Sequence, residues 1–182
     1  MKNHNSRRRE YLPQYTYDDY CNWEGKWELI GGIAYAMTPL PSIAHQRVSG
    51  NIHTQLHELL KGCGRCKPLL PVDWKIAEDT VVQPDNMVVC GEVSGNYLTT
   101  SPVMIFEILS PATTVKDKNL KYEIYQSQGV KYYIIVDVAE KIAEVYGLDD
   151  EQHYTSHGAV KTEVMPFQLE ECRIEFDFGT IW

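Results

Sequence analysis

The segment Val103–Leu109 (VMIFEIL) is apolar at every position except Glu107. Apolar residues at successive positions are typical of a strand buried on both faces, because a half-exposed strand alternates apolar and polar side chains. A sheet covered on both faces needs other elements packed against it, so this segment favours a layered domain of sheet and helices. The glutamate inside the segment needs a physical reason to be there.

Two helices are expected to cover such a sheet. In Ile43–Leu60 the apolar residues recur at helical spacing, and Gly62 follows. A second helix is expected from about Val115 to Gln128, where Gly129 ends it. A short helix is expected at Thr16–Tyr20, followed by a hairpin of Trp27–Ile30 with Ile33–Met37. Further strands are expected at Val72–Ala77, Val81–Val89, Tyr132–Val138 and Ile142–Leu148. Two or three strands follow at the C-terminus, and the last of them alternates Ile174, Phe176 and Phe178. This order predicts a mixed α/β (α+β) domain with a central sheet and added β-hairpins.

The length of 182 residues suits one domain, expected at residues 15–182, after a polar, basic tail at residues 1–14. No apolar run approaches the ~20 residues that a membrane span needs, so no membrane partner is expected. The formal charge of −8 counts against a general nucleic-acid binder, because phosphate contacts need clustered cations. An acidic site loaded with a divalent metal would still attract phosphate.

The five cysteines, at positions 21, 63, 66, 90 and 172, are an odd number at uneven spacing. With no export signal at the N-terminus, they are expected to be thiols in a reducing cytoplasm. His53 and His57, followed by Cys63 and Cys66, offer four possible zinc ligands. Because this ligand order is unusual, solvated histidines and incidental thiols are the favoured interpretation.

Two carboxylates stand in apolar surroundings. Asp85 lies in Gln83–Asn86, a good β-turn tetrapeptide, so a turn and a functional site are both open interpretations. Glu107 costs several kcal/mol unless it is paired or bound to metal, so it indicates either a metal ligand or a buried ion pair. On adjacent strands, the two carboxylates could converge on Mg²⁺. Lys121 in the second helix is either part of such a site or a solvated lysine paired with Asp117.

The order of these residues resembles a known superfamily. Pro84-Asp85, Glu107-Ile-Leu-Ser-Pro-Ala-Thr, then Asp117 with Lys121-Tyr-x-x-Tyr, and Gly129 to Asp137 are similar to the PD-(D/E)XK restriction-endonuclease-like pattern. Glu28-Leu-Ile-x-Gly32 and His45 further resemble its bacterial Uma family of restriction-endonuclease-like proteins. The resemblance covers about Tyr15 to Leu148.

The resemblance implies a central mixed sheet flanked by helices, and a phosphodiesterase dependent on Mg²⁺ or Mn²⁺. Asp85 and Glu107 would be the metal ligands, and Glu28 would complete or orient their coordination. The superfamily places its lysine two residues after the glutamate, where this chain has Leu109; the resemblance implies that Lys121 takes that role. His45 is either a further site residue or a partly buried helix histidine.

Two functions are therefore open: a nuclease acting on nucleic acid, with DNA expected, or a nuclease fold that has become a binding or assembly module. The resemblance also implies a homodimer. Tyr122, Tyr125, Tyr132 and Tyr133 are either a base-stacking platform or, as favoured, core residues.

Overall fold

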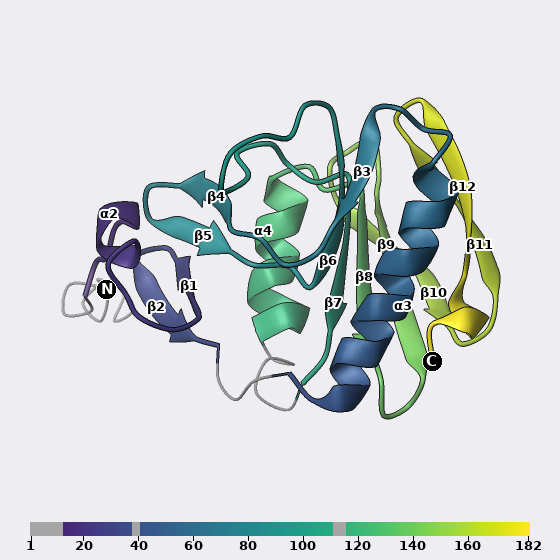
Figure 1. The fold of residues 1–182 in the computed structure, drawn as a ribbon, viewed down its shortest axis with the longest axis horizontal. Helices are drawn as coiled ribbons and strands as arrows, with labels where there is room; N and C mark the ends of the chain where they lie inside the picture. Colours follow the sequence, from purple (N-terminus) through teal and green to yellow (C-terminus); the bar gives the residue numbers. More distant parts are fainter. Residues whose placement is uncertain (1–12, 38–40, 111–115) are drawn as a thin grey trace, which may run out of the picture.

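A computed structural model describes residues 13–37, 41–110 and 116–182. Its largest sheet has six strands in the order β10-β9-β8-β7-β6-β3, and only β7 and β8 run parallel to each other. The strands are β3 (Cys66–Leu69), β6 (Asn86–Cys90), β7 (Met104–Ile108), β8 (Tyr132–Asp137), β9 (Ile142–Leu148) and β10 (Tyr154–Val160). Figure 1 shows β6, β7 and β8 in the middle of the molecule. This mixed sheet confirms the predicted fold class.

Strand β7 is central and buried at every position, as its apolar sequence predicts. Its side chains alternate between two core clusters. Met104, Phe106 and Ile108 belong to the cluster under helix α3 (Ile43–Leu60), whereas Ile105 belongs to the cluster that contains Tyr125 of helix α4 (Tyr122–Ser127). Because Glu107 shares the parity of Ile105, it lies on the α4 side of the sheet.

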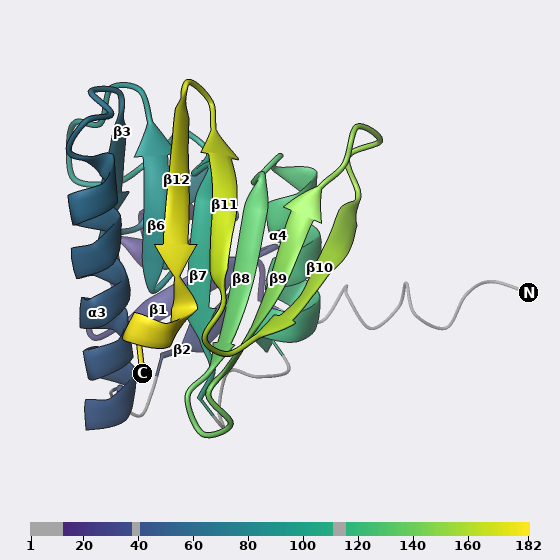
Figure 2. The ribbon, with the colours of Figure 1, turned by 90° about the vertical axis from the view of Figure 1, so that its right-hand side faces the viewer.

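Helix α3 begins and ends at the predicted residues. Ser42 caps it by accepting a hydrogen bond from the backbone N–H of His45 at 3.2 Å. Val48, Ile52, Leu56 and Leu60 form its buried stripe. The hairpin of β11 (Val164–Leu169) and β12 (Cys172–Asp177) packs beside α3 on the same face of the sheet, as Figure 2 shows from the side.

A second sheet, in the order β2-β1-β5-β4, packs on the α4 side. Its strands are β1 (Trp27–Ile30), β2 (Ile33–Ala36), β4 (Trp74–Ala77) and β5 (Thr80–Val82). The short helix α2 (Tyr17–Tyr20) precedes it and is capped by Thr16, as predicted. The β1–β2 hairpin confirms the expected glycine turn, with Gly31 and Gly32 both at positive φ.

The prediction of one strand over Val81–Val89 is wrong. The structure has β5 and β6 there, in different sheets, separated by Gln83-Pro84-Asp85. Pro84 lacks the N–H that a continuing strand would use, so the chain leaves one sheet and enters the other at this point. The break places Asp85 where the two sheets separate.

The second predicted helix is confirmed in place but differs in kind. Residues Lys116–Lys121 form a π-helix, which continues as α4 to Ser127, whereas Val115 lies outside the described residues. Strand β3 was not predicted, because its sequence CKPL contains a proline and does not show a clear alternation of apolar and polar residues. As an edge strand it tolerates Pro68.

The thiol prediction is also wrong for four of the five cysteines. The structure forms disulfides between Cys63 and Cys172 and between Cys66 and Cys90, and leaves Cys21 free and exposed. The spacing of the cysteines along the chain does not reveal this disulfide pairing, because the fold brings together one pair that is 109 positions apart and one that is 24 positions apart. Among the helices that the structure describes, none is both long and apolar enough to cross a membrane.

Candidate active site

Three buried charged side chains meet between the two sheets and helix α4. The ammonium Nζ of Lys121 lies 2.8 Å from Glu28 Oε1 and 2.8 Å from Glu107 Oε1. The exposed fractions of the side chains are 2% for Lys121, 0% for Glu28 and 3% for Glu107. Ionised groups this deeply buried are found paired, because each alone would lose several kcal/mol of hydration.

Each member of this triad comes from a separate element. Glu28 is in β1, Glu107 is in β7, and Lys121 is the last residue of the π-helix. A π-helical turn widens the backbone locally and often accompanies functional positions. The interpretation of Lys121 as a solvated lysine is therefore wrong, and the buried ion pair considered for Glu107 is present.

Two further groups hold the glutamates in place. The Tyr125 hydroxyl donates a hydrogen bond of 2.6 Å to Glu107 Oε1, and the backbone N–H of Gln83 donates one of 3.0 Å to Glu28 Oε1. Burial, and then the negative charge of Glu107, raises the pKa of Tyr125 well above its ordinary value, so the hydroxyl keeps its proton. Sequence reasoning treated Tyr125 as a core residue, although its i,i+4 spacing from Lys121 was a signal that the two side chains share a helix face.

Asp85 lies beside this triad in the bend between β5 and β6. Its Oδ2 accepts a hydrogen bond of 2.8 Å from the backbone N–H of Ile108, the residue after Glu107. His45 Nε2, in the first turn of α3, lies 3.2 Å from the same oxygen. The backbone of Asp85 bends, as the turn interpretation expects, and its side chain points toward β7. Its role as a site residue stays a prediction. His45 is at once a partly buried helix histidine and a neighbour of the site.

The neighbouring Asn86 points to the opposite face, toward α3. Its Nδ2 donates to the backbone oxygen of Ser49 at 3.2 Å, and its buried Oδ1 has no hydrogen-bond partner among the described residues. The β-turn interpretation of Gln83–Asn86 would put Asn86 in a turn, yet it is the fully buried first residue of β6. The contact with Ser49 ties α3, and with it His45, to the strand that follows Asp85.

The donor set suits a hard divalent cation. Carboxylate oxygens are what Mg²⁺ and Mn²⁺ prefer, and Mg²⁺ is commonly held by one or two carboxylates, with water and phosphate oxygens completing the shell. Asp85 Oδ1 accepts no hydrogen bond from any described residue, so it is available to a cation. Lys121, in contact with both glutamates, already offsets part of their charge. The residues fit a site with Asp85 and Glu107 as its protein ligands.

Leu109 stands where the superfamily pattern has its lysine, and it packs against the core on the α4 side. Lys121 instead supplies an ammonium group to the glutamate from the helix, 2.8 Å away. Asp117, the partner considered for Lys121, has a side chain outside the described part of the chain.

An aromatic cavity of about 310 Å³ lies next to the site. Gln83 connects the two, because its side chain lines the cavity while its N–H holds Glu28. The lining of the cavity includes four aromatic residues, Tyr17, Tyr20, Trp23 and Trp27, together with polar residues such as Asp73. The four tyrosines considered as a stacking platform lie elsewhere and contribute to the core, with Tyr125 and Tyr133 fully buried, as favoured.

Comparison with known proteins identifies the family. A family model described as "Uma2: Putative restriction endonuclease" matches residues 15–176. The chain belongs to the Uma2 family. This confirms the predicted resemblance and supports a nuclease-like function for this Uma2 protein.

One solved structure shares the fold of this Uma2 protein. It is described as a putative nuclease belonging to DUF820 from Anabaena variabilis, with a TM-score of 0.74, 16% sequence identity, and coverage of 91% of this chain and 96% of that one. No curated protein matches the chain.

Proposed function

We propose that this Uma2 protein is a divalent-metal-dependent nuclease that hydrolyses phosphodiester bonds, with DNA as the expected substrate. The observation that carries the proposal is the convergence of Glu28, Asp85, Glu107 and Lys121 from four segments, at the boundary between two sheets. A fold of this size has little structural need to bury three charges together, since apolar residues of similar volume pack at no electrostatic cost. Family membership supplies a reaction for which such a cluster is suited.

In the proposed reaction Mg²⁺ or Mn²⁺ supplies Lewis-acid stabilisation of the charge on the phosphate and helps to deprotonate the attacking water. Asp85 and Glu107 would hold the cation. The N–H of Ile108 fixes one oxygen of Asp85, and the hydroxyl of Tyr125 fixes one oxygen of Glu107, so both carboxylates are positioned before a cation arrives.

Lys121 would stabilise negative charge at the phosphate and orient the attacking water. Glu28 positions the ammonium group, because it contacts Lys121 Nζ and is itself anchored by the N–H of Gln83. His45 contacts the same Asp85 oxygen that the N–H of Ile108 fixes, which suits a positioning role.

The test is cleavage of labelled single- and double-stranded DNA and of RNA of the same sequence, with Mg²⁺, Mn²⁺ or a chelator. Wild type should cleave at least one substrate only with divalent metal, and Asp85→Asn, Glu107→Gln and Lys121→Met should each lose about 10²–10³-fold in rate. Glu144→Gln is the matched control, because Glu144 pairs with Lys118 at the surface, where its side chain is 35% exposed. Circular dichroism of each variant separates lost chemistry from lost fold.

A binding or assembly module is the second candidate. The observation in its favour is that Lys121 contacts both glutamates, so the cluster is held together by its own charges. Nucleic-acid binding without cleavage under any metal would favour this function. Homodimer formation and a cytoplasmic location stay predictions; light scattering after size-exclusion chromatography tests the first.

A further inference from the structure

Four cysteines gather at the end of β6 opposite to Asp85. Cys90 is the last residue of β6, five residues after Asp85 and about 16 Å away at ~3.3 Å per residue, so the cluster is separate from the candidate active site. Cys66 begins β3 and pairs directly with Cys90 across the sheet. Cys63 is in the loop after α3, and Cys172 begins β12.

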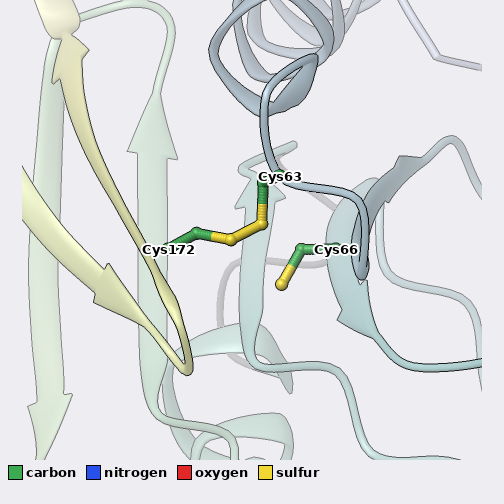
Figure 3. A group of neighbouring side chains, drawn as sticks. All are labelled: Cys63, Cys66 and Cys172. Carbon is green, nitrogen blue, oxygen red and sulfur yellow. A yellow bond between two sulfur atoms is a disulfide. The ribbon is translucent and has the colours of Figure 1, made fainter.

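Three of the four sulfur atoms form one close group, although the disulfides join the four cysteines as two pairs. Sγ of Cys66 is bonded to that of Cys90, and the sulfurs of Cys63, Cys66 and Cys172 all lie within 4.8 Å of one another. Figure 3 shows Cys63 and Cys172 joined, with the side chain of Cys66 next to them. Two disulfides that only cross-link separate segments do not need to lie next to each other.

We propose that the thiol form of this cysteine cluster is a structural zinc site, with Cys63, Cys66, Cys90 and Cys172 as its four ligands. Tetrahedral Zn²⁺ with Zn–S bonds of about 2.3 Å holds its sulfurs about 3.8 Å apart, which is compatible with the 4.8 Å within which the sulfurs of Cys63, Cys66 and Cys172 lie. Cys90 Sγ, bonded to that of Cys66, would move in as the fourth ligand once this disulfide is reduced. Cys63-Gly-Arg-Cys66 has the two-residue spacing common in zinc sites, and its loop folds back so that Cys66 N–H donates to Cys63 oxygen at 3.4 Å. Four protein ligands leave no open position, which is the pattern of a structural site.

The surroundings suit a buried thiolate cluster. Cys66 and Cys90 are 3% and 8% exposed and belong to the core under α3, with Cys63 and Cys172 packed against it. Zinc with four thiolates carries a net charge of −2, and Arg65, Lys67 and Arg173 are chain neighbours of the ligands. Bound zinc would tie the β11–β12 hairpin to the loop after α3 and to the sheet.

The chemistry balances in two steps. A dithiol reductant donates four electrons and four protons to the two disulfides, giving four thiols and two molecules of oxidised dithiol. Zn²⁺ then binds as the four thiols release their protons to the solvent. The histidine-containing zinc set considered from sequence is not assembled: among the described residues, the one group of three or more His, Cys, Asp or Glu ligand atoms that lie within 4.8 Å of one another is Cys63, Cys66 and Cys172.

The test uses the full chain, reduced with a dithiol and then freed of reductant under argon. Zn²⁺ is added, and native mass spectrometry counts the bound metal; Co²⁺ in its place should give the absorption of a tetrahedral cobalt thiolate. We expect one metal per chain, release of about four protons, and a higher melting temperature than for the metal-free thiol form.

Cys90→Ser and Cys172→Ser should lose the cobalt thiolate spectrum, whereas Cys21→Ser, which replaces the exposed free cysteine, should keep it. Asp85→Asn should also keep it, which distinguishes this site from the candidate active site. A reduced wild-type protein that is folded by circular dichroism but binds no zinc or cobalt would overturn the proposal. So would metal binding that survives in both cysteine variants.

Discussion

Replacing Lys121 by methionine tests the buried triad most informatively. Methionine keeps an unbranched chain of similar length but has no charge, so Glu28 and Glu107 would be left buried and facing each other. The wild-type ammonium makes two contacts of 2.8 Å with carboxylates that are 0% and 3% exposed. Removing one partner of a buried ion pair costs about 3–5 kcal/mol, so the free energy of unfolding should fall by about that amount.

Lys118→Met is the matched control on the same π-helix. Lys118 pairs with Glu144 at 2.6 Å, but its side chain is 38% exposed, and exposed pairs contribute only about 0.2–1 kcal/mol. Urea denaturation followed by circular dichroism compares both variants with wild type. The loss of stability in Lys121→Met should be smaller at about pH 5 than at about pH 8. The two carboxylates that face each other in the folded variant take up a proton more readily than they do in the unfolded chain, so a lower pH stabilises the folded variant.

Mn²⁺ adds a second comparison. If the pocket accepts a divalent cation, saturating Mn²⁺ should recover part of the lost stability in Lys121→Met, because it returns positive charge to the carboxylates. A loss in Lys121→Met no larger than that in Lys118→Met, independent of pH, would refute the buried triad.

Three smaller predictions follow from single contacts. Tyr125→Phe should cost about 1–3 kcal/mol in urea denaturation, because the buried oxygen of Glu107 loses a hydrogen bond of 2.6 Å; an unchanged midpoint would contradict this. Burial, then the nearby charge of His57, lowers the pKa of His53 below its ordinary value of 6.5, so stability should decline as the pH falls below about 6.5, and His53→Gln should make the decline shallower. Thr16→Ala should cost about 0.5–2 kcal/mol in the same denaturation assay through loss of the capping box of α2, if that helix unfolds with the rest of the chain.

The elements that sequence predicted well are those whose local signals agree with their tertiary surroundings. Helix α3 has a serine cap, a stripe of buried residues at helical spacing and glycines after its end, and its bounds were found. Strand β7 is apolar throughout because both its faces are covered. Glu107 was found for the same reason, since an ionisable group is conspicuous in that setting.

The features that sequence missed depend on contacts between distant segments. The turn tetrapeptide Gln83–Asn86 is a local sign of a break within Val81–Val89, but no local signal shows that the two halves pair with different sheets. The π-helix that ends at Lys121 and the pairing of Cys63 with Cys172 likewise depend on what the fold brings nearby. Tyr125 was expected to be a core residue and is one, but its hydroxyl also donates a hydrogen bond to Glu107.

The central claim is that Asp85 and Glu107 hold a divalent metal with which the protein cleaves nucleic acid. Calorimetric titration of Mn²⁺ into wild type and into Asp85→Asn/Glu107→Gln tests it most directly, with the cysteines kept as disulfides so that the thiol cluster is not free to bind. We expect saturable binding at one site per chain, which the double variant should lose while it stays folded. Equal binding in both proteins, or none by folded wild type in the presence or absence of DNA, would contradict it.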